Sequence, residues 1–184
     1  MKYLALLRGI NVGGNKKVPM AELKKMFENL KFKNVKTLLN TGNVVFESDS
    51  EASLAEEKSE KILAKNIEEK FSKTFGFDSK IILRNMDEIT KLIKSDPFKK
   101  IEIDENTRLY ISFLGDKHNS KLKIPYTSEN KDFQILKATD DTVISFLQLS
   151  PTMKTIKSMD IIEKEFGKFT TTRNWNTVLK IAKL

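Results

Sequence analysis

Residues 35–47, with the sequence VKTLLNTGNVVFE, predict a β-hairpin, and the flanking elements can be placed relative to it. We expect strands over residues 35–40 and 44–47, because short apolar runs on both sides of turn residues are typical of paired strands. Thr41-Gly42-Asn43 forms the turn, since glycine and asparagine adopt the positive φ that tight hairpin turns require. A hairpin at this place indicates an antiparallel sheet.

A helix and a further strand flank the hairpin on each side. Before it, residues 3–8 predict a strand, and a helix is expected from near Pro19, because proline lacks the N–H that would have no partner at a first helical position. After it, residues 53–75 predict a long helix ended by Gly76, and residues 80–84 predict a strand. The order strand, helix, strand, strand, helix, strand is the ferredoxin-like split βαβ pattern.

The rest of the chain predicts a second unit of mixed helices and strands. Its expected elements are a helix from Asn85, a strand over 108–114, a connection over 116–126 with a helical turn, a hairpin of 132–138 and 142–149, and helices over 158–166 and 174–183. We therefore expect an α+β protein in which a ferredoxin-like unit (1–85) is followed by a second, smaller α+β unit (86–184) packed against it. Both sheets should be antiparallel, with helices on one face.

Composition excludes several kinds of chemistry. The chain has 184 residues, of which 39% are apolar and 32% charged, so it holds enough apolar material for a packed core. It contains no cysteine, which excludes disulfides, zinc held by cysteine and thiol nucleophiles. His118 is the only histidine, so a site with several histidine ligands is excluded, and we expect this side chain in a solvated loop. No catalytic residue stands out, and we expect neither a cofactor nor a metal.

The charge and the hydropathy pattern bear on partners and location. No apolar run approaches the ~18 residues of a membrane span, and the run that ends at Arg8 is shorter than a signal-peptide core, so we expect a cytoplasmic protein without membrane contact. The net charge is +8, and most of the excess, +5, lies in residues 1–50. Such a surface attracts phosphates or nucleic acid, although lysine predominates over the arginine that bidentate phosphate contacts prefer.

The connection after the first strand is the strongest candidate for a binding site. It begins at Arg8, contains Gly9, Gly13 and Gly14, and ends in Lys16 and Lys17 before the first helix. Glycines let backbone N–H groups approach an anion closely, and a helix N-terminus adds partial positive charge. The spacing matches neither a P-loop nor a dinucleotide-binding fingerprint. An ordinary turn with solvated lysines is an equally good interpretation.

Two further segments could contact a ligand. In the hairpin turn, Asn40 and Asn43 could present amides, although a simple turn between core strands is the favoured interpretation. Near the end of the chain, a threonine is expected to cap the last helix, and Arg173 with the first helical N–H groups could bind a carboxylate or phosphate. The alternative there is a capped helix with Trp175 in the core.

Four stretches carry a resemblance to a known family. They are LALLRGINVGGN (residues 4–15), VPMAEL (18–23), TGNVVF (41–46) and TTRNWNTV (171–178). In these the chain resembles the bacterial domain-of-unknown-function family 1697. The resemblance implies an α+β fold of ferredoxin-like units and no particular activity.

If the fold brings the motifs together, they would form a cleft for a small anionic ligand. The candidate ligand-binding residues are Arg8, Asn11, Gly13, Gly14, Asn15, Asn40, Asn43, Arg173, Asn174 and Trp175. A second hypothesis is RNA binding through the basic surface, which the scarcity of aromatic residues on the predicted hairpin disfavours. A third is a homodimeric interaction module.

Overall fold

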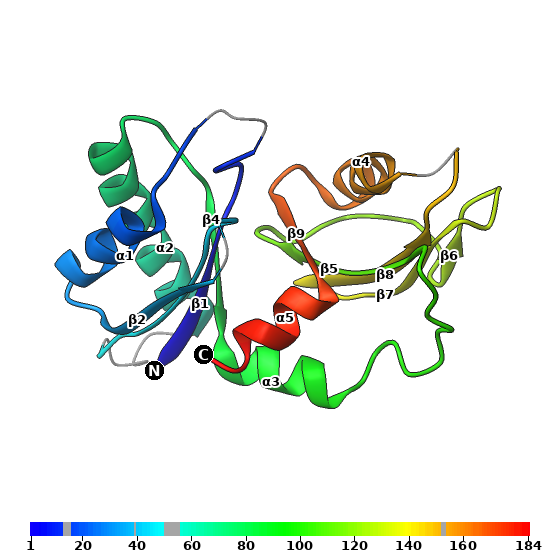
Figure 1. Ribbon diagram of the computed structural model, residues 1–184, viewed down its shortest axis with the longest axis horizontal. Coiled ribbons are helices and arrows are strands. Elements are labelled where there is room, and N and C mark those ends of the chain that lie inside the picture. Colours follow the sequence, from blue (N-terminus) through cyan, green and yellow to red (C-terminus); the bar gives the residue numbers. More distant parts are fainter. Residues whose placement is uncertain (13–15, 39, 50–55, 152–153) are drawn as a thin grey trace. The chain divides into compact units, whose positions relative to one another are not determined.

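The computed structural model describes residues 1–12, 16–38, 40–49, 56–151 and 154–184. The chain forms two compact units (Figure 1). The first consists of Met1–Lys91 together with Lys180–Leu184, and the second of Leu92–Leu179. The C-terminal residues therefore belong with the first unit, where the carbonyl of Leu184 accepts a hydrogen bond from the Lys36 ammonium.

The first unit has the predicted ferredoxin-like order. Its elements are β1 (Lys2–Leu7), α1 (Met20–Asn29), β2 (Lys33–Leu38), β3 (Asn43–Glu47), α2 (Glu56–Phe75), β4 (Ile81–Asn85) and the first part of α3 (Met86–Lys94). The four strands lie in the order β2-β3-β1-β4, and every neighbouring pair is antiparallel. The hairpin, the βαββαβ pattern and the fold class are thus confirmed. The expected helix start at residues 53–55 lies outside the described residues.

The core of the first unit fills the space between the sheet and the helices α1 and α2. Alternate residues of β1 and β3 point to this face, and Phe46 packs edge-on against Phe27 of α1, with ring centroids 5.2 Å apart. Phe71 of α2 is fully buried in the same cluster. On the opposite face, Leu4 and Leu6 of β1 and Val45 of β3 are buried as well.

The second unit is built on a five-stranded antiparallel sheet of order β6-β7-β8-β5-β9. Its elements are β5 (Thr107–Leu114), β6 (Tyr126–Thr127), β7 (Phe133–Ala138), β8 (Thr142–Gln148), α4 (Thr155–Phe166), β9 (Thr170–Asn174) and α5 (Trp175–Ile181). The predicted second hairpin, β7–β8, is confirmed. Ile162 and Phe166 of α4 pack against the sheet in the core of this unit.

Two predictions for the second unit are wrong. The threonines at 170–172 do not cap the last helix; they form β9, which pairs with β5 along its whole length. The reason is that threonine is β-branched and suits an extended strand, and the partner strand supplies the hydrogen bonds. The connection over 116–126 contains no helical turn, and it ends in the short strand β6.

Candidate functional site

The main chain of Arg8 is held from both sides at the end of β1. Its N–H donates to the carbonyl of Lys80 at 2.9 Å, and its carbonyl accepts from the Ser79 hydroxyl at 2.9 Å. On the other side, the N–H of Leu7 donates to the carbonyl of Gly42 at 2.9 Å. The side chain of Arg8 is half-buried. The main chain of Arg8 is thus fixed at the end of β1, and the arginine side chain extends from this fixed position.

Asn11 closes the loop that follows. Its Oδ1 accepts from the N–H of Val18 at 2.7 Å, and its Nδ2 donates to the carbonyls of Val18 at 3.0 Å and Asn40 at 2.9 Å. Asn11 adopts a φ of 54°, a left-handed conformation that asparagine tolerates better than most residues. These bonds join the loop to the β2–β3 turn, so two of the three predicted segments lie side by side. Gly13, Gly14 and Asn15 lie outside the described residues.

The turn is held by Asn43, which is fully buried. Its Nδ2 donates to the carbonyl of Leu38 at 3.0 Å and to the Thr41 hydroxyl at 2.9 Å. Because an amide nitrogen carries two hydrogens, the donors of both Asn43 and Asn11 are engaged within the protein. Asn40, in contrast, has an exposed side chain. Asn11 and Asn43 therefore have structural roles, Asn11 in the loop and Asn43 in the turn.

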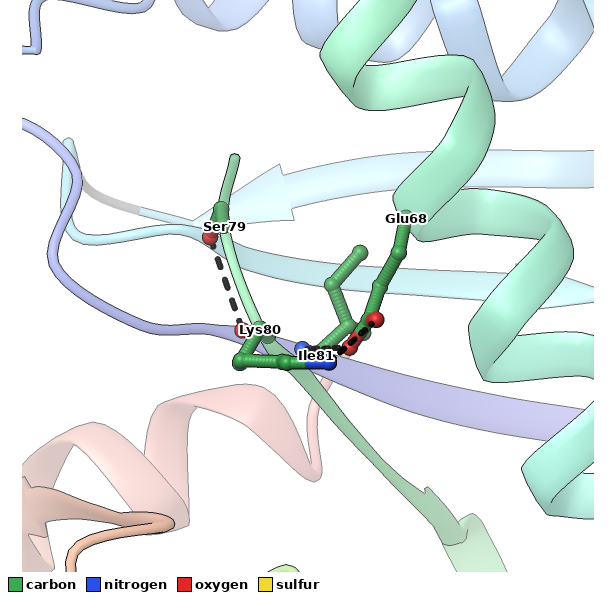
Figure 2. A network of polar contacts seen from close by, with 4 residues as sticks. All are labelled: Glu68, Ser79, Lys80 and Ile81. Atoms are coloured by element: carbon green, nitrogen blue, oxygen red, sulfur yellow. Dashed lines mark hydrogen bonds and ion pairs between the residues drawn. The ribbon is translucent and has the colours of Figure 1, made fainter. Parts of the chain in front are cut away.

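Three lysines, Lys16, Lys17 and Lys80, lie near the end of β1. Lys16 is exposed, and its ammonium lies 5.6 Å from the centre of the Phe77 ring. Neither Lys16 nor Lys17 has an ion pair with any other residue that the structure describes. Lys80 is different, because its ammonium lies 3.1 Å from the Glu68 carboxylate (Figure 2). The same end of the sheet thus carries one lysine paired with Glu68 and two lysines with no acidic partner among the residues that the structure describes.

Arg173 lies in the second unit, on β9. It is only 9% exposed, and its guanidinium donates to the Thr171 hydroxyl at 2.7 Å and to the carbonyl of Thr172 at 3.0 Å. Burial lowers the pKa of Arg173 to about 10, so the group still carries its charge at neutral pH. Asn174 follows it, and its side-chain oxygen accepts from the N–H of Asn176 at 2.9 Å at the start of α5.

Trp175 is half-buried and packs edge-on against Phe98, with ring centroids 5.3 Å apart. Both aromatic residues belong to the second unit. This contact favours the core role that the sequence left open for Trp175.

The comparisons with known proteins identify the family. The profile described as "Protein of unknown function (DUF1697)" matches residues 1–144. The chain belongs to the DUF1697 family. The match includes Arg8, its loop and the hairpin turn of this DUF1697 protein, whereas the motif around Arg173 lies beyond it.

A solved structure supports the fold of this DUF1697 protein. The conserved bacterial protein SP0830 from Streptococcus pneumoniae is similar to it with a TM-score of 0.70 and 22% sequence identity, over 99% of this chain and 97% of that chain. No curated protein matches the chain. None of the helices in the described part of the DUF1697 chain is long and apolar enough to cross a membrane.

His118 has a structural role in this DUF1697 protein and does not stand free in solvent. Its Nδ1 accepts from the N–H of Ser120 at 3.2 Å, which leaves the proton on Nε2, 3.1 Å from the carbonyl of Thr139. The ring also contacts Phe166 edge-on at 4.8 Å and borders a hollow in the second unit. Within the described ranges, no three His, Cys, Asp or Glu residues are grouped so that they could hold a metal ion.

Sequence reasoning missed the groups that fix Arg8. Ser79 and Lys80 follow Arg8 by more than 70 residues, and neither belongs to a recognisable motif. The role of Glu68 could not be predicted either, because α2 contains many charged residues and nothing in the sequence distinguishes this one. A signal existed for β9 alone, because three consecutive threonines favour a strand.

Proposed function

We propose that this DUF1697 protein binds a small anionic ligand, bearing a phosphate or carboxylate group, at the end of the first sheet. Arg8 is the principal cation, and Lys16 and Lys17 add positive charge nearby. One observation carries the proposal: the three hydrogen bonds of Asn11 join it to Val18 and to Asn40 of the β2–β3 turn, and so hold these described residues together at this end of the unit. A site whose backbone is ordered in advance loses less entropy when a ligand binds.

The chemistry of the side chains suits an anion. A guanidinium can meet a carboxylate or phosphate with two parallel hydrogen bonds, and each charge-assisted contact contributes roughly 1.5–3 kcal/mol. The exposed amide of Asn40 could add a neutral hydrogen bond. The net charge of +8 would draw anions toward the protein from solution.

Arg173, Asn174 and Trp175 are a second candidate segment for the same ligand class. Arg173 is the more deeply buried of the two arginines, so its guanidinium is the less accessible to a ligand. We therefore assign the main role to Arg8. Binding that Arg173→Ala abolishes and Arg8→Ala leaves unchanged, with the fold intact, would instead assign the anion site to the second unit.

A thermal-shift screen at low salt tests the proposal, with inorganic phosphate, citrate and nucleotides as ligands. At 100 times its Kd a ligand stabilises the folded protein by about 2.7 kcal/mol, which corresponds to roughly 5 to 10 °C. We expect Arg8→Ala to lose the shift. Arg108→Ala is the matched control, because it removes the same charge from a residue that bonds to the carbonyls of Glu105 and Thr107 in the second unit. Equal shifts in the wild type and in Arg8→Ala would refute the assignment.

The same screen separates the other candidate functions. A shift with short RNA that disappears in salt but survives Arg8→Ala would favour nucleic-acid binding. Against this stands the face of the first sheet away from the helices, where the central strands carry the buried aliphatic residues Leu4, Leu6 and Val45 in place of stacking aromatics. A concentration-dependent melting temperature without any ligand effect would favour a homodimer.

A further inference from the structure

We infer that Ser79 is a positioning residue for the anion site: its hydroxyl fixes the main chain of Arg8 and thereby the place where the guanidinium meets an anion. The inference rests on the proposed binding of an anion by Arg8. It assigns a function to a buried hydroxyl that lies outside every motif of the sequence.

The contact between Ser79 and Arg8 is well defined. Ser79 is 5% exposed, and its Oγ lies 2.9 Å from the carbonyl oxygen of Arg8. The same Oγ lies 3.5 Å from the carbonyl of Lys80, which is at the limit of a hydrogen bond (Figure 2). Because a hydroxyl has one hydrogen to donate, the shorter contact with Arg8 receives it.

Two consecutive residues therefore hold both polar backbone groups of Arg8. Ser79 binds its carbonyl, and the carbonyl of Lys80 binds its N–H at 2.9 Å. Arg8 follows the last residue of β1 and Lys80 precedes the first residue of β4, so the backbone bond from Arg8 to Lys80 continues the antiparallel pairing by one step, and the Ser79 hydroxyl adds a side-chain bond beside it. Without them, the end of β1 would be free to fray at the residue that carries the charge.

The segment that holds Arg8 is itself anchored to α2. Glu68 accepts the N–H of Ile81 on Oε1 at 2.8 Å, and its Oε2 lies 3.1 Å from the Lys80 ammonium (Figure 2). The Lys80 side chain is 68% exposed and that of Glu68 21%, so the part-buried hydrogen bond from the Ile81 N–H is the better shielded of the two contacts. The clamp on Arg8 is thus fixed to a twenty-residue helix.

Ser79→Ala removes one oxygen atom and leaves the charges of the site unchanged. We expect its affinity for an anion to fall roughly three- to tenfold, the equivalent of one net hydrogen bond. Ser48→Ala is the matched control, because Ser48 is also buried and lies at the opposite end of the same sheet, where its N–H donates to the carbonyl of Met1. Ser79→Thr keeps the hydroxyl and should bind as the wild type does.

Isothermal titration with inorganic phosphate and citrate at low salt tests the inference, with melting temperatures recorded for every variant. Support requires that Ser79→Ala binds more weakly while Ser48→Ala and Ser79→Thr keep the wild-type affinity. Wild-type affinity in Ser79→Ala, together with lost binding in Arg8→Ala, would overturn the positioning role and leave the proposed function intact. An equal loss in Ser79→Ala and Ser48→Ala would reduce the role to general stability. No binding by the wild type, or unchanged binding in Arg8→Ala, would refute the proposed function itself.

Discussion

Gly42→Ala is the sharpest test of the geometry at the β2–β3 turn. Gly42 has a φ of 72°, which alanine adopts only at a cost, and a Cβ added there would lie 2.8 Å from the Cβ of Leu7 and 2.9 Å from Cδ1 of Ile10. The Leu7 Cβ is attached directly to the backbone of a central strand, so it cannot swing away as the end of a long side chain would. The turn must therefore shift if Gly42 is replaced.

The expected magnitude follows from two contributions. A positive φ costs an alanine about 1 kcal/mol or somewhat more, and forcing an extra methyl group into packed surroundings costs typically 1–3 kcal/mol. We expect Gly42→Ala to lower the free energy of unfolding by about 2–4 kcal/mol. Gly76 separates the two contributions, because its φ is 76° and nothing lies within 4 Å of an added Cβ. Gly76→Ala should therefore cost only about 1 kcal/mol.

Urea unfolding followed by far-ultraviolet circular dichroism measures both variants. A Gly42→Ala variant as stable as Gly76→Ala would refute the close approach of the turn to Leu7 and Ile10. The displaced turn should also weaken anion binding, because the carbonyl of Gly42 accepts the N–H of Leu7, the residue before Arg8.

Three further changes have defined outcomes. Asn11→Ala removes three hydrogen bonds and should lower the free energy of unfolding by about 2 kcal/mol. Limited proteolysis should then cleave the loop faster than in the wild type. An unchanged cleavage rate would contradict the bridging role of Asn11. Hydrogen bonds from Thr107, foremost that of its hydroxyl, hold the pKa of Asp104 below its ordinary value of 3.8, so this carboxylate stabilises the folded state above that pH and the stabilisation is lost as the pH falls through the lowered pKa. Asp104→Asn should therefore reduce the acid dependence of unfolding monitored by circular dichroism, and identical pH profiles would count against the contact. Phe98→Ala should cost about 3 kcal/mol and shift the Trp175 emission to longer wavelength, because it opens a cavity beside the indole; an unshifted spectrum would contradict their contact.

The fold of the first unit could be predicted because the sequence signals for its helices, strands and turns are local. The turn over Thr41-Gly42-Asn43 demands a positive φ, the apolar stripes have the periods of helices and strands, and Gly76 ends α2 with a φ of 76°. Each of these signals acts within a few residues, so one sequence is enough to detect it. The same reasoning misassigned residues 170–172, since a threonine suits a helix cap and a strand alike and the pairing with β5 decides between them.

In the candidate site, too, some features follow from local sequence and others from long-range contacts. The positive charges near the end of β1 could be predicted without a structure, because Arg8, Lys16 and Lys17 stand in the first strand and the loop after it. The tertiary structure sets the role of each polar side chain. It engages the amides of Asn11 and Asn43 within the loop and the turn, and it places Ser79 against Arg8 across a separation of 71 residues. Two groups form a hydrogen bond only when they lie close together in space. The register of the strands sets this proximity, and a local sequence pattern contains no information about it.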